Sequence, residues 1–293
     1  MIWYLYTIIA LAFFSLGVLL DKYIISNIFR SPSSLMFYSS ISNLLFIPLL
    51  WIIQLPKFPG WDLMLPLLAV GICEVLYLYP YYKALKIEES SVVIALFALG
   101  KIFIPIIAYF LVGERLTYLH YLGFFLIVFA SFAITKQGRL HFRKSLWLMA
   151  LTGIILSVHA SVYKYNLERL DWITAMTWTT LFSTILITVF ALTKFRKETM
   201  QIRKKFARNI HYFLVNEVFN FISFAFLIYS FSLASVTLVE GILALQPIMV
   251  ILLILAGQRF LPGFFKEDLS AKPLLRKAFY FLLIAAGIWL TLG

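Results

Sequence analysis

Long apolar stretches separated by short polar breaks dominate the chain. The stretches run to about 20 residues, the length that a helix needs to cross a bilayer, and they show no strict alternation. Barrel strands need only about 10 residues, so the pattern favours helices. The chain is therefore predicted to be an all-α integral membrane protein with ten transmembrane helices. The predicted spans are 2–26, 34–54, 62–82, 90–112, 118–135, 145–165, 172–193, 210–231, 234–256 and 274–292.

Polar landmarks within the apolar stretches recur at a nearly constant distance. Glu74-Val75 returns as Glu217-Val218 after 143 positions. Lys22-Tyr23 returns as Lys164-Tyr165 after 142 positions. A chain that repeats both its hydrophobic segments and the charges within them is typical of a transporter built from two equivalent halves.

The repeat predicts a division of the chain into two units of five spans. The first unit is expected at 1–135 and the second at 145–293, joined by a linker at 136–144. Because five is an odd number, the second unit crosses the membrane in the opposite sense. This is a 5+5 inverted repeat, and its site is expected near the midplane between the halves.

The composition agrees with a lipid environment. Hydrophobic residues make up 62% of the chain and charged residues 13%, with a mean hydropathy of +0.94. The net charge of +12 comes from loop cations, which we interpret as contacts to anionic lipid headgroups and not to nucleic acid. The single cysteine, Cys73, excludes an internal disulfide and a cysteine-based zinc cage.

Loop cations also predict an orientation. The odd-numbered loops hold most of them, including seven between residues 194 and 208, so we expect these loops in the cytoplasm and both termini outside. The membrane is expected to be the plasma membrane. The run Lys194–Arg208 is either an amphipathic segment on anionic lipid or a plain charged loop.

Glu74 is the first candidate for chemistry. It lies about 18 Å into its span, which is mid-membrane, and Tyr77 and Tyr81 follow on the same helix face. A carboxylate with two phenols suits an amine-bearing solute, and a buried carboxyl suits proton coupling. The structural alternative is an ion pair, or a neutral carboxyl that is hydrogen-bonded to a neighbour.

Three further ionisable residues lie within spans, where each costs about 2.5–3.5 kcal/mol unless it is paired or hydrated. Glu217 and Glu240 are candidates for substrate binding or coupling. Lys101 lies too deep to reach either surface. We expect it to pair with Glu74, or to meet an anionic group of a substrate.

The remaining candidates are Lys22, Lys164 and His159. Snorkelling to the interface is the first reading of the two lysines, and their recurrence in both halves supports a second, in which they contact substrate. His159 has no second ligand at helical spacing, so it is either a hydrogen-bonded interior histidine or part of a proton relay. No cofactor or metal is predicted.

A family resemblance rests on two short motifs. The stretch from Tyr82 to Val93 leads to Gly113-Glu114-Arg115-Leu116-Thr117, and a second copy runs from Ser232 through Gln246-Pro247 to Gly257-Gln258-Arg259. Both are similar to the EamA repeat of the drug/metabolite transporter superfamily. The sequence departs from that family at Lys101, where proline is frequent, and at Gln258, which replaces a glutamate.

The resemblance implies a ten-helix carrier that works by alternating access around a central cavity. It also implies cytoplasmic termini, against the loop charges. We therefore expect a secondary active transporter of a small polar or zwitterionic organic metabolite, with a lipid headgroup flippase or scramblase as the alternative. An intramembrane enzyme is a third class, for which familiar motifs are missing. A homodimer is compatible with the sequence.

Overall fold

The computed structural model describes residues 2–29, 31–88, 90–135, 145–258, 282–284 and 286–290, and every regular element within them is helical. The α-helices are α1 (Ile2–Ile24), α2 (Pro32–Phe46), α3 (Trp61–Ile87), α4 (Ser90–Gly100), α5 (Ile104–Val112), α6 (Tyr118–Thr135), α7 (Ser145–Leu167), α8 (Trp172–Lys194), α9 (Arg196–Gln201), α10 (Arg203–Arg208), α11 (Ile210–Leu233), α12 (Val236–Leu243) and α13 (Gln246–Gln258). Three short segments of other helix types adjoin them: the π-helix η1 (Ile25–Phe29) and the 3-10 helices η2 (Ile47–Ile52) and η3 (Lys101–Phe103).

Membrane-spanning length is met by six of the described segments. They are Ile2–Phe29, Pro32–Ile52, Trp61–Ile87, Trp147–Leu167, Trp172–Lys194 and Ile210–Leu233. Lys101–Val112, Tyr118–Ala130 and Val236–Val250 are shorter apolar helices. The predicted linker 136–144 and most of the predicted last span, 274–292, lie outside the described residues.

Two predicted spans are interrupted in the structure. The span predicted at 90–112 is divided into α4, η3 and α5, and the span predicted at 234–256 is divided into α12 and α13. Each interruption lies just before a proline, Pro105 or Pro247, at the second position of the helix that follows. Proline has no N–H and its ring excludes the preceding carbonyl, so it breaks the helix at this point. Hydropathy does not show such breaks because apolar residues continue through them.

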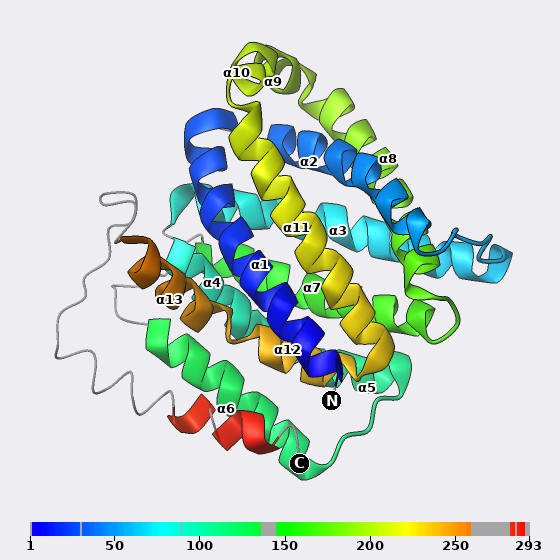
Figure 1. Cartoon of the computed structure of the whole chain (residues 1–293), viewed down its shortest axis with the longest axis vertical. Helices are drawn as coiled ribbons and strands as arrows, with labels where there is room; N and C mark the ends of the chain where they lie inside the picture. The colour runs from blue at the N-terminus through cyan, green and yellow to red at the C-terminus, as the bar shows by residue number, and fades with distance from the viewer. Residues whose placement is uncertain are drawn as a thin grey trace.

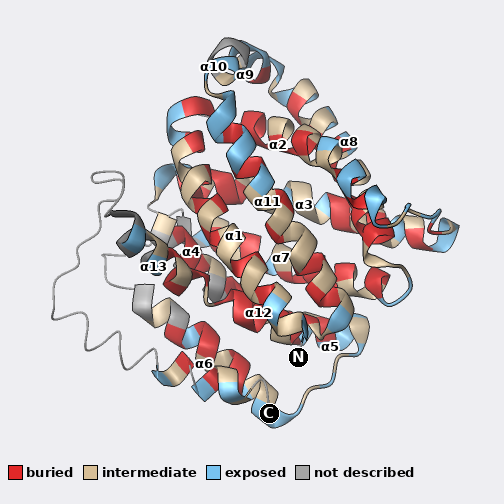
Figure 2. Ribbon diagram, viewed as in Figure 1, coloured by how far each residue is buried: buried red, intermediate tan, exposed pale blue. Residues whose placement is uncertain are grey.

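The outer surface is apolar. Ile52, Phe110 and Trp289 are all more than 70% exposed, as is Trp61 at the start of α3. Figure 2 shows buried positions where the helices meet and exposed positions on their outer flanks. Apolar exposure on this scale is unfavourable in water and ordinary in lipid, and tryptophans at helix ends are typical of the bilayer interface.

Helices from the two parts of the chain interleave (Figure 1). α1 packs along α11 and α3 packs along α7. α2 contacts α8, α4 contacts α7, and α13 contacts α1. One buried core cluster accordingly combines Leu67 of α3, Tyr163 of α7 and Phe231 of α11. The core thus lies between the two parts and is built by both.

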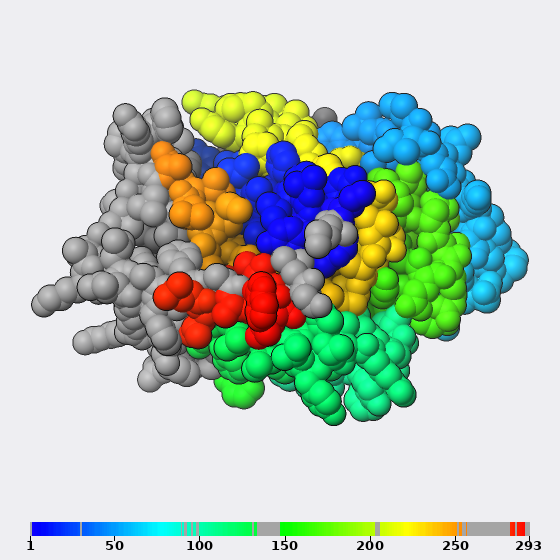
Figure 3. Space-filling model, turned by 60° about the horizontal axis from the view of Figure 1, so that its bottom comes forward, coloured from blue at the N-terminus to red at the C-terminus, as the bar shows by residue number. Residues whose placement is uncertain are grey.

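The connections gather at two ends of the helix bundle. At one end, α9 and α10 cover the turn between α1 and α2: the Ser31 hydroxyl donates to Glu198 Oε2 at 2.5 Å, and the Tyr38 ring stacks on Phe206 with 4.3 Å between centroids. The run that the sequence left open as an amphipathic segment or a plain loop therefore folds into two short helices. At the other end, shown in Figure 3, α1 begins between α11 and the α5–α6 region. The indole of Trp178 there donates to the carbonyl of Lys57 at 2.9 Å.

Candidate functional site

A central cavity of about 170 Å³ lies where the two parts of the chain meet. Its walls come from α1, α2, α3 and α4 of the first part and from α7, α8, α11 and α12 of the second. An engineered cavity of about 150 Å³ accepts benzene, so this one has room for a small solute. Seven of the predicted site residues line it: Glu74, Tyr77, Tyr81, Lys101, His159, Glu217 and Glu240.

Lys101 pairs with a different partner from the one predicted. Its Nζ lies 2.6 Å from Glu240 Oε2, and the side chains are 3% and 4% exposed. The expected pairing with Glu74 was wrong because the break at η3 puts Lys101 next to α12. The ion pair joins the two interrupted helices. Lys101 lies in η3, between α4 and α5, and Glu240 lies in the last turn of α12, just before the break that precedes α13. Each charge therefore balances the other inside the bundle.

Glu217 belongs to a polar cluster that also contains an acid missed by sequence reasoning. The hydroxyl of Ser39, on α2, donates to Glu217 Oε1 at 2.7 Å. Asp21, on α1, accepts from Asn216 Nδ2 at 2.8 Å and from the Tyr81 hydroxyl at 3.5 Å. Asp21 also lines the cavity. The signal that could have revealed it is an aspartate in an apolar run beside the recurring Lys22.

Glu74 has a different environment. It is half-buried at the middle of α3, and Ser183 of α8 lines the same cavity. The Tyr77 and His159 rings meet edge to face at 5.4 Å, and His159 meets Tyr163 at 5.6 Å. His159 Nε2 is buried and has no hydrogen-bond partner among the described residues. This part of the cavity is a carboxylate beside an aromatic wall, with one unsatisfied imidazole nitrogen.

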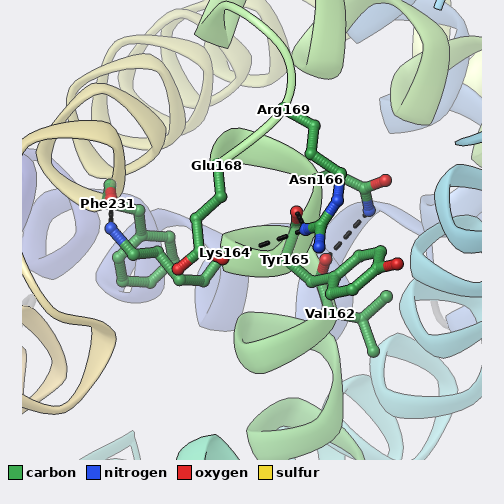
Figure 4. Close-up of polar contacts among 7 residues, drawn as sticks. All are labelled: Val162, Lys164, Tyr165, Asn166, Glu168, Arg169 and Phe231. Carbon is green, nitrogen blue, oxygen red and sulfur yellow. Dashed lines mark hydrogen bonds and ion pairs between the residues drawn. The ribbon is translucent and has the colours of Figure 1, made fainter. Parts of the chain in front are cut away.

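Lys22 and Lys164 are not among the residues that line the cavity. Lys22 Nζ donates to the carbonyls of Leu85 and Glu88, at 2.7 and 2.6 Å. Lys164 Nζ donates to the carbonyls of Phe231 and Ala234, at 2.8 and 2.9 Å, and Figure 4 shows its bond to Phe231.

The two lysines thus make the same contact. Each lysine donates to the last carbonyls of a long helix. Lys22 donates to those of α3, and Lys164 donates to those of α11. Carbonyls at a helix C-terminus lack partners and carry partial negative charge, so a buried cation there is stabilising. The structure thus gives both lysines a contact to helix ends, and the prediction that they contact substrate stays a prediction.

The resemblance motif at the end of α5 has a structural role. Gly113 adopts a left-handed conformation, with φ of +68°, and ends the helix. The Glu114 carboxylate then accepts from the N–H groups of Val236 and Thr237, at 2.9 and 3.2 Å, and so caps α12. Burial raises the pKa of Glu114, and these bonds act in the opposite direction. The side chain of Gln258, at the equivalent place in the second motif, lies outside the described residues.

Metal ligation finds no support in the described part of the chain. No three His, Cys, Asp or Glu side chains come together there in a way that could hold a metal ion. The site consists instead of four carboxylates, one lysine and one histidine around a small cavity: Asp21, Glu74, Glu217, Glu240, Lys101 and His159.

Several apolar helices around a charged cavity define an integral, multi-pass membrane protein of transporter type. Residues 1–136 match the model of the EamA-like transporter family, which confirms the resemblance read from the motifs. The chain is also similar in fold to a crystal structure of a protein that is 14% identical, with a TM-score of 0.65. That alignment covers 98% of this chain and 94% of the other. No curated protein matches the chain.

Proposed function

We propose that the protein is a secondary active transporter that moves a small polar or zwitterionic organic metabolite by alternating access. The observation that carries this is the central cavity, which takes carboxylates from both parts of the chain. Intramembrane ionisable groups that face an interior cavity are typical of substrate and proton pathways. The expected localisation is the plasma membrane with the odd-numbered loops in the cytoplasm.

The proposal includes a 5+5 inverted repeat with units at 1–135 and 145–293. Three features support it. Lys22 and Lys164 make matching contacts to helix ends, as described above. The packing of α1 on α11 matches that of α7 on α3. Both interrupted helices break before a proline, as expected of discontinuous helices at a midplane site.

The repeat is inexact in one respect. Glu74 lies eleven residues before Leu85, whereas Glu217 lies fourteen residues before Phe231. The two acids therefore differ by three residues, about one helical turn, in their distance from the matching lysine contacts. Equal spacing in sequence thus does not put Glu74 and Glu217 at equal depth in the bundle.

The proposed roles follow from the two environments. Glu74 binds an amine or a proton, and Tyr77 with His159 forms the wall against which the carbon part of the solute lies. Tyr81 orients Asp21 in the polar cluster. Lys101 and Glu240 neutralise each other, and either one can exchange its partner for a charged group of a zwitterion. The cavity volume limits the solute to a few non-hydrogen atoms.

Neither alternative class has a specific observation in its favour. A lipid flippase needs lysines available at headgroup depth, but Lys22 and Lys164 donate to backbone carbonyls. An intramembrane enzyme built on His159, Glu217 and Glu240 needs these side chains within mutual hydrogen-bond reach. Instead Glu240 bonds to Lys101, Glu217 bonds to Ser39, and His159 Nε2 has no partner among the described residues.

The test has two stages. A thermal-shift screen of the purified protein against amino acids, amines, choline, nucleotide sugars and sugar phosphates identifies a ligand, because binding to the folded state raises the Tm. Uptake of that ligand into proteoliposomes is then measured for the native protein, for Glu74→Gln, and for Glu168→Gln as the matched surface control. We expect Glu74→Gln to abolish uptake or its pH dependence, and Glu168→Gln to behave as the native protein. Unchanged uptake by Glu74→Gln would remove Glu74 from the mechanism.

A further inference from the structure

The cluster of Asp21, Asn216 and Glu217 contains buried oxygens that nothing satisfies. Glu217 is 0% exposed, and Ser39 bonds only to its Oε1. Glu217 Oε2 has no hydrogen-bond partner among the described residues, and neither has Asn216 Oδ1. A buried polar atom without a partner costs about 1–3 kcal/mol, and a buried charge costs more. Two such atoms on consecutive residues of α11 point to a missing ligand.

The cluster also lacks a positive charge among the described residues. Asp21 accepts a hydrogen bond from Asn216, the neighbour of Glu217, so the cluster holds two acids. Neither forms an ion pair within the described residues. The cavity's lysine, Lys101, is bonded to Glu240, and Lys22, which follows Asp21 in the sequence, is bonded to helix carbonyls. The missing ligand is therefore a cation.

The size of that cation is limited by burial. Solvent does not reach Glu217 Oε2 or Asn216 Oδ1. A group as large as a water molecule, and therefore any organic ammonium, does not fit beside them in this conformation. The neighbouring amide of Asn220 closes the space on the α1 side, where its Oδ1 lies directly against Gly17.

The described residues of the other half of the bundle form no equivalent cluster. Asp21 precedes Lys22 in the sequence, whereas Tyr163 precedes Lys164. The Tyr163 hydroxyl hydrogen-bonds to Thr179 at 2.8 Å, and its ring contacts His159 and Phe224. The bundle thus has one aromatic region with a single half-buried carboxylate and one region of fully buried acids and amides. These two regions suit different ligands.

We propose that Asp21, Asn216 and Glu217 form a binding site for a small inorganic monovalent cation, separate from the organic substrate at Glu74. The ligands are carboxylate and amide oxygens, which suit either a sodium ion or a proton. A role of this site in coupling cation movement to transport rests on the proposed function. Binding of the cation itself does not depend on that function. Because the cluster joins α1 to α11, the cation connects the two halves of the bundle.

The experiment measures the Tm of the full-length protein in detergent without organic substrate. In the first arm, N-methylglucamine chloride at pH 8 is replaced by sodium or potassium chloride at constant ionic strength. In the second arm, sodium is absent and the pH is lowered from 8 to 6. The variants are Asp21→Asn, Glu217→Gln and Ser39→Ala, with the surface variant Glu168→Gln as the control. The titratable groups around the cluster and cavity are Asp21, Tyr77, Tyr81, Tyr82, Glu217, Glu74, His159, Lys101 and Glu240.

The expected result is a cation-dependent rise in Tm that needs the cluster. For sodium, the native protein gains a few °C for each tenfold increase above the dissociation constant, and potassium has a smaller effect. For a proton, the gain comes from the pH change alone. In either case Asp21→Asn and Glu217→Gln lose the gain, Ser39→Ala weakens it, and Glu168→Gln keeps it.

Three results would overturn the proposal: gains that persist in both Asp21→Asn and Glu217→Gln, gains that Glu168→Gln abolishes equally, or a native protein that responds only to organic amines. Ser39→Ala removes one neutral hydroxyl, so it keeps the test informative if the charge variants do not fold. A cation-dependent rise without any transport would remove the transporter proposal and leave this site in place.

Discussion

The Lys101–Glu240 ion pair allows a quantitative test of how the two parts of the chain are held together. At 2.6 Å between Nζ and Oε2, the Coulomb attraction is on the order of 6 kcal/mol for an effective dielectric constant of about 20. Desolvation of two nearly inaccessible side chains offsets a similar amount. The pair is therefore close to neutral overall, and loss of one member leaves an uncompensated charge in the bundle.

We expect Glu240→Gln and Lys101→Met each to lower the free energy of unfolding by about 3–5 kcal/mol. The double variant Lys101→Met with Glu240→Leu should recover most of this loss, because no charge remains unpaired. The assay is reversible unfolding in mixed micelles of increasing SDS content, analysed as a double-mutant cycle. The surface pair Arg169–Glu168, at 3.8 Å and more than 40% exposed, is the matched control, and Glu168→Gln should change stability by less than about 0.5 kcal/mol.

Single variants that each lower the free energy of unfolding by less than about 1 kcal/mol, with effects that simply add in the double variant, would contradict this role of the ion pair. In that case the two charges would be hydrated separately, and the two interrupted helices would not be joined by them.

Two further predictions concern helix packing, and both are measured by the same unfolding assay. Lys22→Met and Lys164→Met should each lower the free energy of unfolding by about 1–3 kcal/mol, because each removes two charged hydrogen bonds at a helix end. A large effect of only one of them would argue against matching roles. Gly17→Ala should lower the free energy of unfolding by about 1–3 kcal/mol, because the new methyl group meets Asn220 Oδ1 and this outweighs the helix propensity of alanine. A more stable variant would show that Asn220 moves freely.

Local patterns predicted the elements well. Hydropathy located the helices between residues 2 and 258, because the bilayer sets their length. The recurring Lys22 and Lys164 make matching contacts to the ends of long helices. The nature of these contacts was not visible, because a lysine that caps a distant helix and a lysine that contacts substrate have the same local sequence.

The sequence did not reveal which charged residues far apart along the chain contact each other. Lys101 and Glu240 are 139 positions apart, and their contact depends on two helix breaks that hydropathy does not show. Asp21 was missed because it lies near the end of its predicted span, where an acid is inexpensive. Helical structure continues past Asp21 to Phe29, and Asp21 lies on the side of α1 that packs against α11, where it bonds to Asn216. Tertiary packing, and not local propensity, decides which charges meet.

Access to the cavity from both sides of the membrane tests the central claim most directly. In a Cys73→Ala background, which removes the single native cysteine, Tyr77→Cys provides a reporter in the cavity wall and Leu76→Cys a control at the same depth on the lipid-facing side. Sealed proteoliposomes are treated with a membrane-impermeant thiol reagent from either side. Alternating access predicts that position 77 reacts from both sides while position 76 does not react. Reaction at 77 from one side only, or no reaction from either side, would contradict it.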